Sequence, residues 1–364
     1  QLGMNGRQVF RLIEWPALAP MLAPMAAIIF ALTFTSFAVV LTLGGGPAST
    51  TIEVAIYQAL RFDFDVDAAV GLALLQLLLT TTLIAVILTR TRRFPVAPAL
   101  GIDFPRPSRG GIGAAIADAA GFALGAVFIL LPLLGVVLPA LAALSLENLS
   151  DPALWRAAGW SLAIGLIAGG MAFATGLALL FATCELGLRR GHVKIAAGLE
   201  GTASMILVVP PMLLGAGLFL ALRGWLDVFA IGPWLVVLVN ALMGLPFVLR
   251  ILGPEILRSA QDNDRLASAL GIGGLHRWRL VDWPDIRKPA GVALGLAVTL
   301  SVGDLGVIAL FGTPGTTTLP LLIFQRMGAY RMDEAAVGIL VLIGLAIALF
   351  AGLERLVGGR HAVS

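Results

Sequence analysis

Residues 303–338 read GDLGVIALFGTPGTTTLPLLIFQRMGAYRMDEAAVG, and residues 36–71 read SFAVVLTLGGGPASTTIEVAIYQALRFDFDVDAAVG. Aligned from residues 36 and 303 without a gap, the two segments end on the same Ala-Ala-Val-Gly and share loop residues in register. The shared loop residues are Gly45 and Gly312, Pro47 and Pro314, Thr51 and Thr318, and Gln58 and Gln325. Two unrelated apolar helices would not place these residues in register, so the pattern predicts an internal repeat.

The repeat extends to the start of the chain. Residues 1–16, QLGMNGRQVFRLIEWP, align with residues 269–284, ALGIGGLHRWRLVDWP, a basic and tryptophan-bearing stretch in a chain that is otherwise strongly apolar. Leu-Gly, Arg-Leu and Trp-Pro occur at the same places in both stretches. The sequence therefore predicts two copies of one loop, each followed by a copy of the apolar segment quoted above.

Composition places the chain in a membrane. Hydrophobic residues make up 59% of its 364 residues and charged residues 12%, with a mean hydropathy of +0.97. That leaves too little polar surface to cover a water-soluble globule. The apolar runs are continuous and long enough for helices of about 20 residues to cross the bilayer. We expect an all-α polytopic protein with eight spans, at residues 17–43, 68–88, 112–143, 158–183, 203–222, 229–253, 290–311 and 335–353.

Lysines and arginines set the expected orientation. If residues 1–16 are cytoplasmic, most of the 24 basic residues fall in inner loops or in the tail after residue 354. Both ends of the chain then face the cytoplasm, and the net charge of +3 reflects these loops rather than a nucleic-acid-binding surface. Six crossings separate the two copies, so we expect a parallel repeat with its axis along the membrane normal.

The repeat also divides the chain. We expect residues 1–93 to be the last part of a first half, with its loop at 1–16, and residues 94–111 to be a cytoplasmic linker. Residues 112–364 form the second half, with its loop at 254–289. Within the second half, four predicted spans precede the loop, whereas no span precedes the loop of the first half. We therefore expect a longer parent protein with twelve spans.

The two inner loops resemble the EAA loop of binding-protein-dependent ABC importer permeases. Gly3 precedes Pro16 at the interval that separates Gly271 from Pro284, and Arg265 departs from the glutamate of that family. The resemblance implies a membrane permease whose short coupling helices dock on two copies of an ATPase subunit. The candidate coupling residues are Gly3, Arg7, Arg11, Pro16, Arg265, Ala267, Leu270, Gly271, Arg277, Trp278, Arg279 and Pro284.

The second loop also carries leucines and tryptophans of its own, enough apolar surface to dock on another body. Arg277 and Arg279 suit the acids of a partner or the headgroups of anionic membrane lipid. The alternative is an interfacial helix anchored by its tryptophans and basic residues. The existence of a second copy favours the docking loop.

The outer segments quoted first are similar to those of thiamine (vitamin B1) ABC importer permeases, and the similarity covers nearly the whole chain. This resemblance implies a protein of the bacterial cell inner membrane that imports thiamine and its phosphate esters. The implied partners are a periplasmic substrate-binding protein and a separate ATPase. Iron(III) permeases share the fused two-half plan and are the nearest alternative in substrate.

The sequence shows no catalytic site. Neither Lys194 nor Lys288 lies in the GxxxxGK[ST] pattern that binds phosphates, and the three histidines lack the spacing of a metal site. We therefore expect no enzyme activity, no metal and no cofactor, and we assign ATP hydrolysis to the partner.

Asp304 is the ionisable residue that lies deepest in a predicted span, which makes it a functional hypothesis by default. A carboxylate that lines a path suits the passage of a cation. The structural alternative is that Asp304, between Gly303 and Gly306, caps a break in the helix and binds free backbone amides. The candidate path residues are Asp304, Ser36, Gln58 and Gln325.

The two predicted outer loops, 44–67 and 312–334, are duplicated, so they suit a periplasmic binding protein and the closure of the path; simple hairpin connectors are the alternative. Two other classes of function remain open. One is a secondary transporter coupled to protons or sodium through Asp304, and the other is a structural or assembly protein of the membrane.

Overall fold

The computed structural model describes residues 5–34, 36–44, 50–90, 112–206 and 209–359. These described residues form helices, turns and connectors without a strand, which confirms the all-α fold class. Gly3 lies outside them, as do residues 45–49 of the first expected outer loop and the predicted linker at 94–111.

The first copy and its loop fold into five α-helices and one π-helix. They are α1 (Gly6–Val9), η1 (Phe10–Glu14), α2 (Trp15–Phe34), α3 (Ala38–Leu43), α4 (Ile52–Arg61) and α5 (Val66–Arg90).

The elements that follow are α6 (Ile112–Ala142), α7 (Leu146–Leu149), α8 (Pro152–Cys184), η3 (Glu185–Arg189), α9 (Val193–Met205), α10 (Pro211–Leu222) and α11 (Gly232–Ala269). The second copy then comprises α12 (Gly274–Arg277), η5 (Trp278–Asp282), α13 (Trp283–Val302), α14 (Gly306–Phe311), α15 (Leu319–Gly328) and α16 (Met332–Gly358).

The structure repeats in the register that the sequence predicts. The bounds of α1, η1 and α2 coincide with those of α12, η5 and α13 when residue 1 is aligned with residue 269. Those of α4 coincide with those of α15 when residue 36 is aligned with residue 303. Two chemically different sequences therefore build the same series of helices, including a π-helical turn at the same place in both loops.

Six described helical segments are long and apolar enough to cross a membrane, so the expected count of eight is not confirmed. The expected span at 203–222 is interrupted, because α9 ends at Met205 and α10 begins only at Pro211. Adjacent prolines remove two backbone donors and separate the helices. The 12 residues of α10 cover about 18 Å, too little for the hydrocarbon core.

The expected outer loops also differ from simple connectors. Each contains a ten-residue helix, α4 or α15, with one face buried in the protein. In α4 the buried residues recur at the spacing of one helical face, which places Ile56, Tyr57 and Leu60 in the core. These helices therefore help build the protein at the expected outer end.

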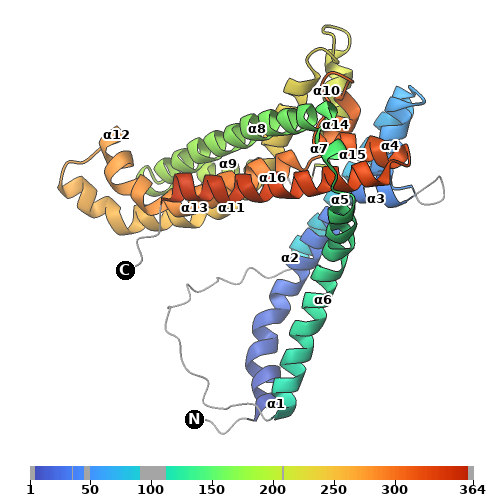
Figure 1. Cartoon of the computed structure of the whole chain (residues 1–364). Coiled ribbons are helices and arrows are strands. Elements are labelled where there is room, and N and C mark those ends of the chain that lie inside the picture. Colours follow the sequence, from blue (N-terminus) through green and yellow to red (C-terminus); the bar gives the residue numbers. More distant parts are fainter. Residues whose placement is uncertain (1–4, 35, 45–49, 91–111, 207–208, 360–364) are drawn as a thin grey trace.

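Four long helices, α8, α11, α13 and α16, lie side by side and form the main bundle (Figure 1). The ends of α10, α14, α15 and α4 gather at one end of this bundle, and α12 lies at the other. Helices α2 and α6 leave the bundle near the first of these ends (Figure 1).

The contact between α8 and α13 depends on glycine. A Cβ atom on Gly169 would lie 2.7 Å from the backbone nitrogen of Val298, and one on Gly165 would lie 2.4 Å from a methyl carbon of Val302. Small residues four apart let two helices approach closely, and in lipid this packing replaces the hydrophobic effect as a source of attraction.

We predict that Gly169→Ala destabilises the protein by about 1–3 kcal/mol, because the added methyl group must push α13 away from α8. The matched control is Gly170→Ala, one residue along the same helix, where a Cβ would meet no atom within 4 Å. There the higher helix propensity of alanine should raise stability slightly. Thermal unfolding of the two variants in the same detergent compares them, and equal midpoints would contradict this account.

Candidate functional site

Glycine shapes the second loop. After α11 ends at Ala269, Gly271 and Gly274 adopt φ values of +65° and +59°, and the amide of Ile272 donates to the carbonyl of Ala267. Only glycine takes left-handed backbone angles at little cost. The chain therefore reverses direction sharply and presents α12 and η5 beyond the end of the bundle.

Apolar side chains cover the outside of this loop. Leu266, Leu270 and Leu280 are 61%, 65% and 62% exposed. The rings of Trp278 and Trp283 lie 5.3 Å apart and form a second apolar surface beside them. Exposed apolar groups of this size at the end of a bundle are typical of a surface that binds another body.

The predicted coupling residues separate into two sets. Arg265, Leu270, Gly271, Trp278, Arg279 and Pro284 are exposed. Ala267 is buried, and Arg277 is only 7% exposed. Arg277 therefore points inward, where it pairs with Asp264 and with Asp282, the second at 3.4 Å.

The ion pairs of Arg277 continue into the neighbouring helix. Asp264 also binds Arg189 at the end of η3, at 3.2 Å, and Arg189 binds Glu185 at 2.9 Å. The loop after α11 is thereby tied to the end of α8. Sequence reasoning placed Arg277 on the docking surface, whereas the structure gives it the role of holding that surface in place.

The described part of the first loop begins with a different device, a side-chain cap on α1. Asn5 and Gln8 form a capping box, in which each side chain bonds the backbone amide of the other. Arg7, Arg11 and Pro16 are exposed. Helices α1 and α12 lie at different ends of the molecule, so the structure does not bring the two loops together (Figure 1).

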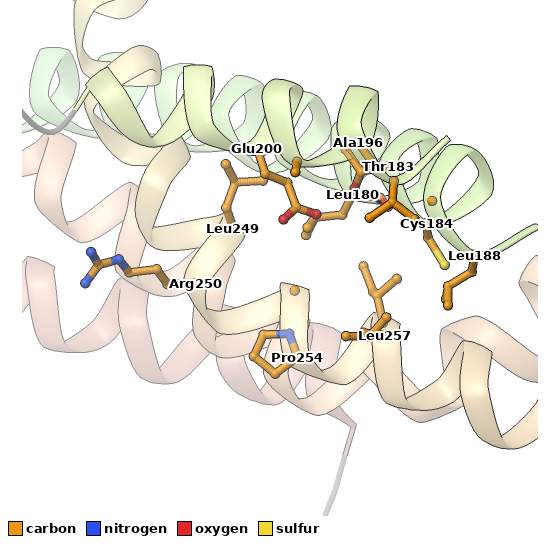
Figure 2. Close-up of a pocket in the computed structure, with 15 residues that line it drawn as sticks. Leu180, Thr183, Cys184, Leu188, Ala196, Glu200, Leu249, Arg250, Pro254 and Leu257 are labelled. Carbon is orange, nitrogen blue, oxygen red and sulfur yellow. Dashed lines mark hydrogen bonds between the residues drawn. The ribbon is translucent and has the colours of Figure 1, made fainter. Parts of the chain in front are cut away.

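A pocket of about 690 Å³ lies between α8, α9 and α11, beside the ion pairs of Arg189 (Figure 2). Its lining is mainly apolar, with leucines from α8, η3 and α11, valine and alanines from α9, and Cys184. Glu200 points into the pocket from α9, and Arg250 lies at its edge on α11 (Figure 2).

Asp304 lies at a break between two helices. Helix α13 ends at Val302 and α14 begins at Gly306, and the Asp304 carboxylate accepts bonds from the amides of Gly306 and Val307 at 3.2 and 3.3 Å. These are the free amides that open a new helix and find no partner in lipid. The capping role that the sequence left as an alternative is confirmed.

The two copies of the repeat meet at this break. A Cβ on Gly306 would lie 3.6 Å from Oδ1 of Asp304 and 3.7 Å from a ring carbon of Phe37, which precedes α3. Farther along, Arg61 of α4 donates to the carbonyl of Gly312 at 3.4 Å and lies over the ring of Phe229. Elements of the first copy thus pack directly on α14.

The three other predicted path residues differ from one another in exposure. Ser36 is half-buried next to Phe37, whereas Gln58 and Gln325 are exposed on α4 and α15. Gln58 and Gln325 occupy equivalent positions on the two copies, as the repeat requires.

No protein-family model matches the chain. Individual curated proteins, in contrast, are similar to it. The thiamine transport system permease protein ThiP of Brucella abortus is 43% identical over 99% of the chain, and the chain spans 66% of that protein. Proteins of the same name from Salmonella typhimurium and Escherichia coli are each 37% identical over 100% and 98% of the chain, which spans 67% and 66% of their lengths. The chain belongs to this permease family.

Sequence reasoning missed one buried acid of this permease. Glu53 on α4 is 1% exposed, and its Oε1 accepts a bond from the side-chain amide of Gln76 on α5 at 3.0 Å. The signal was present, because Glu53 shares a helical face with Ile56, Tyr57 and Leu60. It was overlooked because residues 44–67 were expected to form an exposed loop.

Burial raises the pKa of Glu53 to about 7, although the bond from Gln76 lowers it, and the carboxylate of Asp304 adds a smaller increase. Glu53 and Asp304 are therefore close enough to influence each other's charge. The permease places two acids, one from each copy, where the copies meet.

We predict that Arg277→Ala lowers the stability of the permease by about 1–3 kcal/mol, because Asp264 and Asp282 lose a buried cationic partner. The control Arg279→Ala removes the same charge from an exposed position on the same loop and should change stability by less than about 0.5 kcal/mol. Unfolding midpoints of the two variants in one detergent provide the comparison. A midpoint for Arg277→Ala equal to that of the control would show that the ion pairs do not hold the loop.

Proposed function

We propose that this permease moves thiamine from the periplasm to the cytoplasm as the membrane subunit of an ABC importer. The observation that carries the proposal is the 43% identity over 99% of the chain to a thiamine transport system permease. The proposal extends to thiamine phosphate esters and to a bacterial inner membrane, with both ends of the chain in the cytoplasm.

The two loops supply the coupling in this proposal. ATP hydrolysis belongs to two copies of a partner ATPase, and the apolar surface around Leu270 and Trp278 is the docking site in the second half. The ion pairs from Arg277 through Asp264 to Arg189 carry the motion of the docked loop into α8. Separate positions of α1 and α12 (Figure 1) suit two ATPase clefts.

We place the path between the two halves, residues 1–93 and 112–364, with 94–111 as their linker. Asp304 supports this placement because it lies where elements of both copies meet. A periplasmic binding protein would deliver thiamine at the end where α4, α10, α14 and α15 gather (Figure 1). Alternating access follows if docking and release of the ATPase separate and rejoin the two halves.

Growth tests the substrate. A thiamine auxotroph that lacks the gene should grow poorly at limiting thiamine and recover with the gene restored on a plasmid. Equal growth with and without the gene rejects thiamine as the substrate. A defect that iron(III) but not thiamine relieves would assign the permease to iron import instead.

We predict that Leu270→Glu abolishes co-purification of the ATPase, because a charge replaces an apolar contact at the centre of the docking surface. Leu146→Glu is the matched control, since Leu146 is 88% exposed and belongs to α7, which lies at the opposite end of the bundle from α12 (Figure 1). Pull-down of the ATPase through tagged permease measures both variants. Retention of the ATPase by Leu270→Glu at the level of the control places the docking site elsewhere.

A further inference from the structure

In the folded repeat Ser36 is the residue equivalent to Asp304, and Phe37, the next residue of the first copy, approaches the same point as Asp304. That point is the Cβ position of Gly306, 3.7 Å from the Phe37 ring and 3.6 Å from the Asp304 carboxylate. The segments that precede α3 and α14 are equivalent, and equivalent segments of a twofold repeat touch next to the axis that relates the copies. In a parallel repeat this axis runs along the membrane normal. The break before α14 therefore lies on the centre line of the molecule.

The first copy supplies a second buried acid on α4, a helix that packs against α14. Glu53 is 1% exposed and Gln76 is fully buried, and the two side chains bond each other between α4 and α5. Oε1 of Gln76 is buried without a hydrogen-bond partner among the described residues. An acid buried without a cation and an unpaired amide oxygen beside it both cost free energy in a protein interior. Both would be satisfied by a ligand that is positively charged and donates hydrogen bonds.

Aromatic rings complete the surroundings of the two acids. Tyr57 lies one helical turn after Glu53 on α4, and its ring meets that of Phe37 edge-on at 5.3 Å. Both rings are 5% exposed. Carboxylates combined with aromatic faces are the usual means by which proteins bind an organic cation, since each ring attracts positive charge through its π-face.

The acids do not follow the repeat. Pro320 stands in the second copy at the position of Glu53, and Ser36 stands in the first copy at the position of Asp304. Each copy thus contributes one acid from a different element, so the axis carries one site rather than two equivalent ones.

We propose that Glu53, Gln76, Tyr57, Phe37 and Asp304 form a single binding site for an aromatic organic cation on the axis between the two halves. The inference rests on the proposed function and deepens it, since thiamine is such a cation. Glu53 and Gln76 are buried here, so the structure represents the site closed, and the cation enters as α4 and α14 separate.

The competing explanation is structural, in which Glu53 and Gln76 only join α4 to α5. Glu53→Gln separates the two explanations, because it keeps the shape and can keep the bond to Gln76 but removes the charge. If the acid serves only the fold, uptake is unchanged. If it binds a cation, uptake falls while the protein becomes no less stable, since the variant no longer buries a carboxylate.

The test uses the complete transporter in lipid vesicles with ATP, the binding protein and radiolabelled thiamine. Glu53→Gln and Asp304→Asn should each lower uptake about tenfold, the equivalent of about 1.4 kcal/mol of lost interaction with the cation. Glu53→Asp keeps the charge and should retain most of the uptake. The matched control is Asp63→Asn, which removes an exposed carboxylate just after α4 and should leave uptake within about twofold of the wild type.

Two further measurements keep the outcome decisive. Binding-protein-stimulated ATP hydrolysis reports assembly, and it should persist in every variant that folds. If both acid variants fail to assemble, Tyr57→Leu against Tyr57→Phe tests the site instead, because only leucine removes the aromatic face. Wild-type uptake by Glu53→Gln, or equal uptake by the two Tyr57 variants, overturns the proposal. Failure of the wild type itself to take up thiamine overturns the proposed function and not the site.

Discussion

A helix that breaks inside a membrane frees backbone amides that lipid cannot satisfy, and the rest of this structure depends on how that break is tolerated. In the second copy the carboxylate of Asp304 accepts the amides of Gly306 and Val307. The break lets the chain turn into α14 and then α15, which lie at the end of the bundle where α4 of the first copy packs. One capping interaction thus permits the contact through which the two copies meet.

The two copies share a fold and differ in chemistry. Helix bounds coincide from α1 to α4 and from α12 to α15, yet Asp304 is matched by Ser36 and Glu53 by Pro320. Packing and turn residues preserve the repeat, because both copies must form the same breaks and turns. The two acids do not repeat, so each comes from one copy alone, and this asymmetry suits the single cation site that we propose between the copies.

The sequence alone predicted the features that depend on the length of apolar runs and on the positions of glycine and proline. The helical class and the repeat follow from apolar runs and from glycine and proline in register. Features that depend on contacts between distant segments did not follow. Arg277 was taken as exposed because its partners lie in other elements, and Glu53 was passed over because only tertiary packing buries α4. The expected count of eight spans is not confirmed among the described residues, and apolar composition does not reveal that α10 is short.

The central claim is that an ATPase, acting through two loops, drives an organic cation along the axis between the halves. The most direct test is the energy source for thiamine accumulation in vesicles that contain the complete transporter. The account predicts accumulation with ATP and binding protein, and none with a proton or sodium gradient alone. Accumulation driven by an ion gradient without ATP would contradict it and make Asp304 the coupling acid of a secondary transporter.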